Sequence, residues 1–124
     1  MADSVITSYR DLLVWQASIE LAVVCYDVTR GFPREELYGM VSQIRRSATS
    51  MAANIAEGHG RDGTAQFVQF LRIAQGSTKE LETHTIIAQR VGLVQPDAAE
   101  DILGRCSEIG RMLRSLIRSL EVRT

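Results

Sequence analysis

The stretch LYGMVSQIRRSATSMAANIAEGHGR, residues 37–61, decides the fold. Its larger apolar residues recur at steps of four and three, which is the a/d heptad pattern of a helix that packs against other helices. These residues are Leu37, Val41, Ile44, Ala48, Met51 and Ile55. Small residues occupy the positions beside them, so a neighbouring backbone can come close. We therefore predict one long, central helix that ends at Gly58.

The preceding segment, residues 12–30, also has helical periodicity. Asp11 is its predicted N-cap, and Gly31 followed by Pro33 ends it. One predicted face carries Leu12, Trp15, Ile19, Ala22 and Tyr26, and a milder stripe beside it carries Leu13, Ala17, Val24 and Val28. A helix that is apolar on two flanks is expected to contact more than its own bundle.

Two further helices are predicted, over residues 64–91 and from Pro96 onward. Gly76 in the first costs about 1 kcal/mol relative to alanine, so we expect another helix to approach closely there. The two seams consist of Phe67, Leu71, Ala74, Thr78, Leu81, Thr85 and Ala88, and of Ile102, Cys106, Ile109, Leu113, Leu116 and Leu120. These patterns indicate a single all-α domain over residues 1–124, an antiparallel up-down-up-down four-helix bundle with residues 1–8 as a flexible arm.

The composition is typical of a globular domain in water. Of the 124 residues 45% are hydrophobic and 23% are charged, and the net charge is −1. No segment has the ~20 apolar residues of a membrane span, and the N-terminus lacks the apolar run of a signal peptide. Cys25 and Cys106 fit neither a CxxC metal motif nor a disulfide framework, which favours buried free thiols and a cytoplasmic location.

Four segments carry a family resemblance: YRDLLVWQ (9–16), FPREELYG (32–39), SQIRRSATSMAANIAEGHGR (42–61) and FVQFLRIAQGSTKELET (67–83). They resemble the bacterial four-helix bundle proteins first described as products of intervening sequences in large-subunit ribosomal RNA genes. The resemblance implies a bundle that assembles as a homopentamer. The same family includes the accessory variability determinant of diversity-generating retroelements, which binds nucleic acid and a reverse transcriptase. Ala52 stands where related sequences tend to have proline, so this helix is expected to be straighter.

Arginines are the candidate contacts for an anionic partner, because the guanidinium fork matches phosphate geometry. Residues 102–124 hold five arginines against two glutamates. The candidate nucleic-acid-binding residues are Arg45, Arg46, Arg61, Arg111, Arg114 and Arg118. The alternative is structural: Arg61 pairs with Glu57, Arg45 and Arg46 bridge to acids on adjacent helices or subunits, and the last three form a solvated face.

Other polar residues give weaker indications. Asn54 and Glu57 could orient a ligand, but we favour a structural hydrogen-bond network between helices or subunits. A di-iron bundle needs Glu-x-x-His pairs, and neither His59 nor His84 has a glutamate three residues earlier. Glu80 and His84 would make half of such a site at most. We therefore predict no metal, no cofactor and no catalytic residues.

Gly58, Gly60 and Gly63 spell GxGxxG, but a nucleotide-binding turn needs a preceding strand, and here a helix precedes it. We interpret these glycines as a C-cap and a flexible corner. The leading functional prediction is a non-enzymatic oligomer that engages RNA, DNA or a reverse transcriptase through arginine-bearing surfaces, without a membrane role. The alternative is a structural or protein-binding oligomer with no nucleic-acid role.

Overall fold

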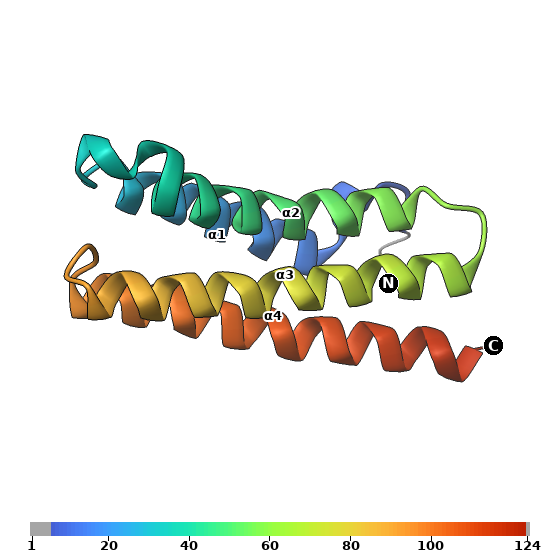
Figure 1. The fold of residues 1–124 in the computed structure, drawn as a ribbon. Coiled ribbons are helices and arrows are strands. Elements are labelled where there is room, and N and C mark those ends of the chain that lie inside the picture. Colours follow the sequence, from blue (N-terminus) through green and yellow to red (C-terminus); the bar gives the residue numbers. More distant parts are fainter. Residues whose placement is uncertain (1–5, 124) are drawn as a thin grey trace.

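The computed structural model describes residues 6–123, which form four α-helices and no β-strand in that range. The helices are α1 (Leu13–Thr29), α2 (Ser42–His59), α3 (Thr64–Arg90) and α4 (Pro96–Arg123). Consecutive helices run in opposite directions, and the α1–α2 pair lies over the α3–α4 pair (Figure 1). The all-α class is confirmed. Among the described residues, no helix is long and apolar enough to cross a membrane.

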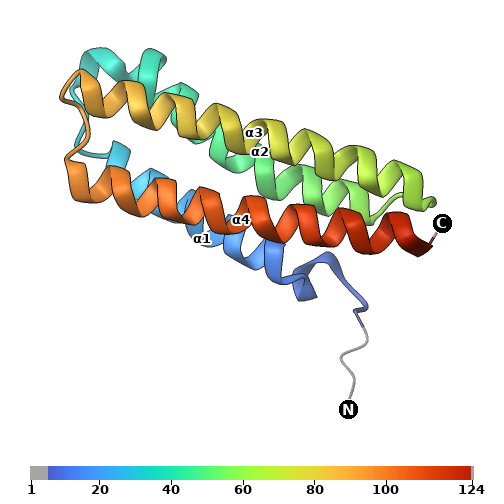
Figure 2. The ribbon, with the colours of Figure 1, turned by 90° about the horizontal axis from the view of Figure 1, so that it is seen from below.

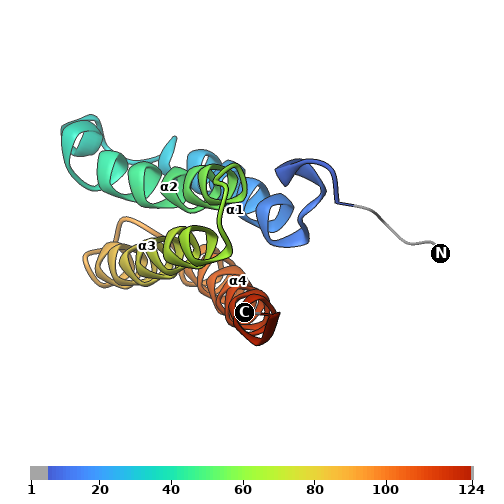
Figure 3. The same cartoon turned by 90° about the vertical axis from the view of Figure 1, so that its right-hand side faces the viewer.

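The core follows the predicted seams of α2 and α3. These two helices contact each other more extensively than any other pair, and they are neighbours in the end-on view of Figure 3. Val41, Ile44, Ala48, Met51 and Ile55 are buried, and so are the α3 residues Leu71, Ala74, Thr78, Leu81, Thr85 and Ala88. The exception at the start is Leu37, which is 47% exposed. In α3, Phe67 of the predicted seam is only partly buried, and Val68 beside it is buried instead. The heptad spacing therefore predicted the α2 seam correctly from Val41 onward and the α3 seam from Leu71 onward.

The buried face of α1 differs from the predicted one. Val14, Ser18, Leu21, Cys25 and Thr29 point inward. The hydroxyls of Ser18 and Thr29 donate to backbone carbonyls one turn earlier, at 2.8 and 2.7 Å, so they are buried without an unmet hydrogen bond. The prediction failed because α1 is apolar on most of its circumference, and the periodicity gave no contrast between faces.

The bounds of α1 match the expectation to within one residue, but its caps differ. Ser8 is the N-cap of a short 3₁₀ helix, η1 (Tyr9–Asp11), and Asp11 is the third residue of that helix and completes its capping box; α1 itself starts without a side-chain cap. Thr7 and Ser8, from the predicted arm, donate backbone N–H groups to the Asp11 carboxylate at 3.1 Å. Residues 1–5 of that arm lie outside the described residues. Gly31 does not adopt the left-handed conformation of a glycine cap.

The predicted long helix over residues 37–61 is broken near its start. Gly39 has the non-helical angles φ −109° and ψ −110°, inside a π-helical segment, η3 (Leu37–Val41), that precedes α2. The Glu36 carboxylate accepts the backbone N–H of Met40 at 3.2 Å. Glycine permits the unusual backbone at residue 39, so the chain turns here and Leu37 does not join the core.

Two glycines have roles opposite to those predicted. Gly58 lies within α2 and is buried, and a Cβ at this position would stand 2.5 Å from the Phe70 Cβ. It is therefore a close-packing residue, and Gly60 is the C-cap. Gly76 was expected to mark a close helix approach, yet a Cβ there would meet nothing within 4 Å. That expectation is wrong for the contacts within the chain.

The last helix keeps its predicted seam through Leu113 and then departs from it. Ile102, Cys106, Ile109 and Leu113 are buried, but Ile117 is the next buried residue and Leu116 and Leu120 are half-buried. A straight helix drifts relative to a strict heptad by about 20° per seven residues. The start of α1 also diverges from α4 towards this end (Figure 2), which leaves the final turns of α4 less covered.

Candidate functional site

A row of polar side chains runs along the contact between α2 and α3, and we call it the polar seam. Its members are Gln43, Arg46, Ser50 and Asn54 of α2 and Ser77, Glu80 and His84 of α3. The steps of three and four residues place each set on one helix face. The polar seam thus lies beside the apolar seams of the same two helices.

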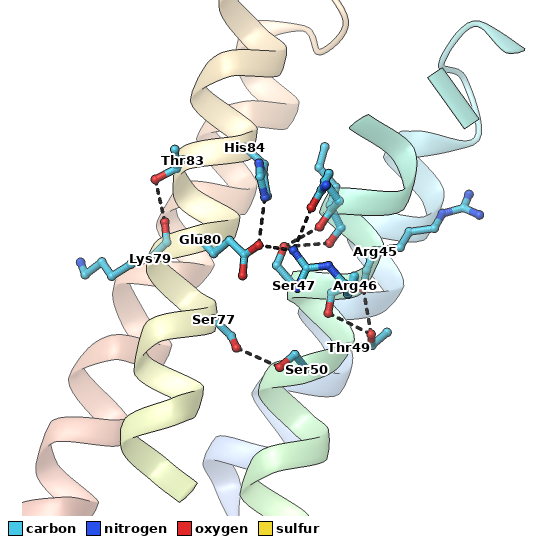
Figure 4. A network of polar contacts seen from close by, with 12 residues as sticks. Arg45, Arg46, Ser47, Thr49, Ser50, Ser77, Lys79, Glu80, Thr83 and His84 are labelled. Carbon is cyan, nitrogen blue, oxygen red and sulfur yellow. Dashed lines mark hydrogen bonds and ion pairs between the residues drawn. The ribbon is translucent and has the colours of Figure 1, made fainter. Parts of the chain in front are cut away.

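Glu80 is the centre of the upper part of the polar seam. Its carboxylate forms an ion pair with Arg46 and lies 3.3 Å from Nε2 of His84, between the two side chains (Figure 4). Arg46 also donates to the Gln43 side-chain oxygen at 2.8 Å. The Arg46 hydrogen bond is the main cause that lowers the pKa of Glu80, and His84 adds to it. Glu80 therefore stays ionised and joins α2 to α3.

The lower part of the polar seam is a neutral hydrogen-bond chain. The hydroxyls of Ser50 and Ser77 are 2.9 Å apart, and the Asn54 amide donates to the backbone carbonyl and hydroxyl of Ser50 at 2.8 and 3.0 Å. Asn54 is half-buried. Its amide thus takes part in a network between helices, which is the structural interpretation favoured for Asn54.

Arg45 points away from α3 (Figure 4) and joins α2 to α1. Its Nε donates to the Thr29 hydroxyl at 2.9 Å, and its guanidinium lies 4.3 Å from the centre of the Tyr26 ring. A cation over an aromatic face is stabilised by about 0.5–1 kcal/mol at such partly exposed sites. Arg45 and Arg46, adjacent in sequence, therefore serve two different helix contacts.

Arg61 and Glu57 pair with each other at the end of α2. Arg61 donates to the Glu57 carboxylate at 2.5 Å and lies 5.0 Å from the centre of the Phe70 ring. Both side chains are about half exposed, at 46% and 53%. The pair holds the corner between α2 and α3, and it matches the structural alternative for Arg61.

The three α4 arginines lie on one exposed side of the helix, but they have different surroundings. Arg111 pairs with Glu108 at 2.6 Å and lines a groove between α1 and α4, whereas Arg114 lines a groove between α3 and α4. Arg114 and Arg118 are exposed and have no ion-pair partner among residues 6–123. Arg45 also lacks a carboxylate partner there, but it is held by Thr29 and Tyr26. Of the candidate arginines, Arg114 and Arg118 are therefore the two with neither an ion pair nor a hydrogen bond within the described chain.

The two cysteines are buried as free thiols. Burial raises the pKa of both Cys25 and Cys106 to about 12, with Asp101 adding to the effect at Cys25 and Glu82 at Cys106. The thiolate, which is the reactive form, is therefore suppressed. Among residues 6–123, no group of three or more His, Cys, Asp or Glu side chains is arranged to hold a metal ion.

Several residues of these contacts were absent from the sequence prediction. Glu80 and His84 were considered only as metal ligands, and Ser50, Ser77 and Tyr26 were not considered as polar or aromatic partners. Their positions, at steps of three and four along faces of α1, α2 and α3, were the available indication. Arg72 and Lys79 were also not predicted, although both lie at a groove between α3 and α4.

Two comparisons bear on the fold and one finds nothing. The model of the family described as 23S rRNA-intervening sequence protein matches residues 10–115. A crystal structure from Bacteroides thetaiotaomicron is similar, with 30% sequence identity and a TM-score of 0.79. The match covers 85% of this chain and 98% of that chain, and the Bacteroides protein is described as a protein with unknown function from the S23 ribosomal protein family. No curated protein matches the chain.

Proposed function

The chain belongs to the 23S rRNA-intervening sequence protein family, and from this membership we propose that it is a cytoplasmic, non-enzymatic oligomer that binds nucleic acid. Its partners would be RNA or DNA, alone or together with a nucleic-acid enzyme such as a reverse transcriptase. The proposal is supported most directly by Arg114 and Arg118, which are exposed on α4 and unpaired among residues 6–123.

Self-association is the second part of the proposal, with a homopentamer as the expected assembly. Leu13 and Val23 of α1 are 69% and 53% exposed. Beside Leu13, a groove of about 850 Å³ lies between α1 and α4, with the apolar residues Ile6, Leu12, Met112 and Leu116 in its lining. Repeating a weak cationic surface around a ring would raise the avidity for a polyanion without a strong site on any one subunit.

RNA titration at two salt concentrations tests the nucleic-acid part. We expect binding of a structured RNA at about 50 mM salt that weakens steeply towards about 200 mM, because cations on the protein release counterions from phosphates. Arg118→Gln should weaken binding more than Arg34→Gln. Arg34 is the matched control, because it is also exposed and unpaired among residues 6–123 but belongs to η2 (Arg34–Glu36) and not to α4. Absence of binding at low salt would overturn this part of the proposal.

A structural or protein-binding oligomer remains the competing function, and specific contacts favour it. Arg45 and Arg46 are both used between helices, and the net charge of the chain is −1. Nucleic acid that co-purifies with the protein, detected by a raised ratio of absorbance at 260 and 280 nm, would contradict it. A reverse transcriptase gene with a template repeat, or an rRNA intervening sequence, beside this gene would also favour the nucleic-acid role.

A further inference from the structure

A second groove, of about 420 Å³, lies between α3 and α4 and is lined by residues from both helices. We call it the α3–α4 groove. Its lining consists of Arg72, Gln75, Gly76, Thr78 and Lys79 of α3 and Gly110 and Arg114 of α4. The volume falls within the range of about 300–1,000 Å³ that is usual for ligand pockets. The groove is therefore large enough for a small polar group and its neighbours.

The charge of the α3–α4 groove is of one sign. Arg72, Lys79 and Arg114 are cationic, and no lining residue is acidic. Arg72 is paired with Glu121 at 2.8 Å, and Lys79 is paired with Glu82 at 3.2 Å. Neither glutamate is part of the groove lining. Arg114 has no ion-pair partner among residues 6–123. The groove thus offers one guanidinium without an ion pair, together with two cations that are already partly neutralised.

Two glycines keep the α3–α4 groove open. A Cβ at Gly76 would meet nothing within 4 Å, so packing within the chain gives no reason for a residue that costs a helix about 1 kcal/mol. At Gly110, the nearest atom to an added Cβ would be Nη1 of Arg114, at 3.7 Å. The Arg114 guanidinium therefore lies over bare backbone, and a larger residue at either glycine would occupy part of the groove.

We propose that the α3–α4 groove binds a phosphodiester group of a nucleic-acid strand. Arg114 is the principal contact, because a guanidinium can donate two parallel hydrogen bonds to phosphate oxygens. Arg72 and Lys79 flank the phosphate, and the Gln75 amide, whose side chain has no hydrogen-bond partner among residues 6–123, donates to the strand. This inference rests on the proposed nucleic-acid function and gives it a location on the molecule.

Filling the groove without removing a charge is the first test. Gly76→Leu places a side chain in the groove and improves helix propensity, so the variant is expected to fold. Fluorescence anisotropy with a labelled RNA hairpin at about 50 mM salt should show roughly tenfold weaker binding, the loss expected for one charge-assisted contact. Gly104→Leu is the matched control, because Gly104 is also an open α4 glycine but does not line the groove.

Removing the free charge is the second test. Arg114→Gln should weaken RNA binding by a similar factor and reduce the slope of log affinity against log salt by about 1. Arg90→Gln removes one exposed charge from the last turn of α3, outside the groove, and should change both quantities much less. If Arg90→Gln weakens binding as much as Arg114→Gln, the contact is diffuse electrostatics and the groove assignment is wrong.

The outcomes separate this inference from the proposed function. If the Gly76→Leu variant binds RNA as tightly as the wild-type protein, the groove assignment is wrong but the proposed nucleic-acid function is unaffected. Wild-type protein that binds no RNA at low salt overturns both. A mononucleotide is added as competitor, with sodium chloride of equal ionic strength as reference. If the mononucleotide displaces the hairpin and sodium chloride of equal ionic strength does not, the groove takes a small phosphorylated ligand, which contradicts the strand assignment.

Discussion

At Gly58 the fold depends on the absence of a single carbon atom. The residue lies in α2 where the helix crosses the side chains of Phe67 and Phe70 on α3. Beside it, Arg61 covers the Phe70 ring and the His59 ring meets Phe67 edge-on, with centroids 5.7 Å apart. The aromatic residues of α3 can therefore pack against α2 backbone only because no side chain stands between them.

Gly58→Ala is predicted to destabilise the protein by about 1–3 kcal/mol, the usual cost of overpacking a close contact. An alanine Cβ would lie 2.5 Å from the Phe70 Cβ, which forces the helices apart. Urea unfolding followed by circular dichroism measures the change. Gly104→Ala is the control, and it should stabilise the protein by up to about 1 kcal/mol because its position is open. Equal stability of the two variants would contradict the role of Gly58.

The buried thiols give a second prediction at this scale. Burial raises the pKa of Cys25 and Cys106 from 9.0 to about 12, so on the order of 10⁻⁴ of each is thiolate at pH 8. A thiol-specific reagent should not modify the folded protein within minutes at pH 8, whereas both cysteines should react in denaturant. The protonated thiols favour folding below pH 9, and this contribution is lost as the pH rises towards about 12. Rapid reaction of either thiol in native buffer would contradict this.

Among the helices, α2 packs against α1 and α3 and uses a different polar contact with each. It meets α1 through Arg45, which lies over Tyr26, and meets α3 through the polar seam. Its heptad seam fills the core between the other helices. The polar contacts stand at the margins of that core, where charged groups keep some solvent and cost little to pair.

Glu80→Gln should make the link between α2 and α3 weaker and less sensitive to pH. The contact with Arg46 lowers the pKa of Glu80 below its usual 4.5, so its contribution to stability is present above pH 4.5 and lost as pH falls through the lowered pKa. We expect a loss below about 1 kcal/mol at pH 7, because the pair is partly solvated. Thermal melts from pH 7 to 3 measure the difference from wild type, which should vanish at the acid end.

The control for this pH dependence is Glu100→Gln. Glu100 is exposed near the start of α4 and has no ion-pair partner among residues 6–123. Its replacement should leave the stability at pH 7 within about 0.5 kcal/mol of wild type. A Glu80→Gln profile that follows the Glu100→Gln profile would mean that the Arg46 contact does not favour the folded state.

Sequence periodicity predicted those elements in which apolar and polar residues contrast. The α2 and α3 seams have polar neighbours and were located correctly, whereas α1 is apolar on most faces and its buried line was misplaced. Gly58 and Gly76 were misread because glycine marks a helix end in one place and a close contact in another, and only the neighbouring helix distinguishes the two. The departure of α4 at Leu116 reflects helix geometry, which a strict heptad ignores.

For the candidate arginines, the residue type could be interpreted from the sequence but the contact partners could not be predicted. Their residue type suggested phosphate contact, but the partner of a long side chain depends on the neighbouring helices. Thr29 and Glu80, which contact Arg45 and Arg46, are 16 and 34 residues away in sequence. Gln75 and Lys79 lie in the segment 67–83 that carries the family resemblance, but nothing in that segment gave them a role. Only the packing of α3 against α4 brings them to one groove.

At the scale of the whole molecule, the bundle is asymmetric. α2 and α3 pack along their length, while the start of α1 diverges from α4 (Figure 2). The divergence leaves the apolar α1–α4 groove and the exposed Leu13 at one end. Apolar surface left open in this way is typical of proteins that associate.

Multi-angle light scattering should give a mass several times that of the 13.8 kDa chain, with a pentamer as the expected state. Leu13→Asp should shift the mass towards the monomer, because a charge at a buried contact between subunits lacks a partner. Leu37→Asp, at a similarly exposed leucine on the far side of the Gly39 break, is the control and should keep the wild-type mass. A strictly monomeric wild-type protein would overturn the oligomer proposal.

Lys79 has a practical consequence that follows from its position. It is the chain's one lysine, its side chain is 76% exposed, and it lies at the α3–α4 groove. Apart from the α-amino group, it therefore holds the single primary amine of the protein. A formaldehyde cross-link from a side-chain amine to a bound strand would therefore form at this one position. Acetylation of the same amine would remove one of the positive charges of the groove and should weaken strand binding.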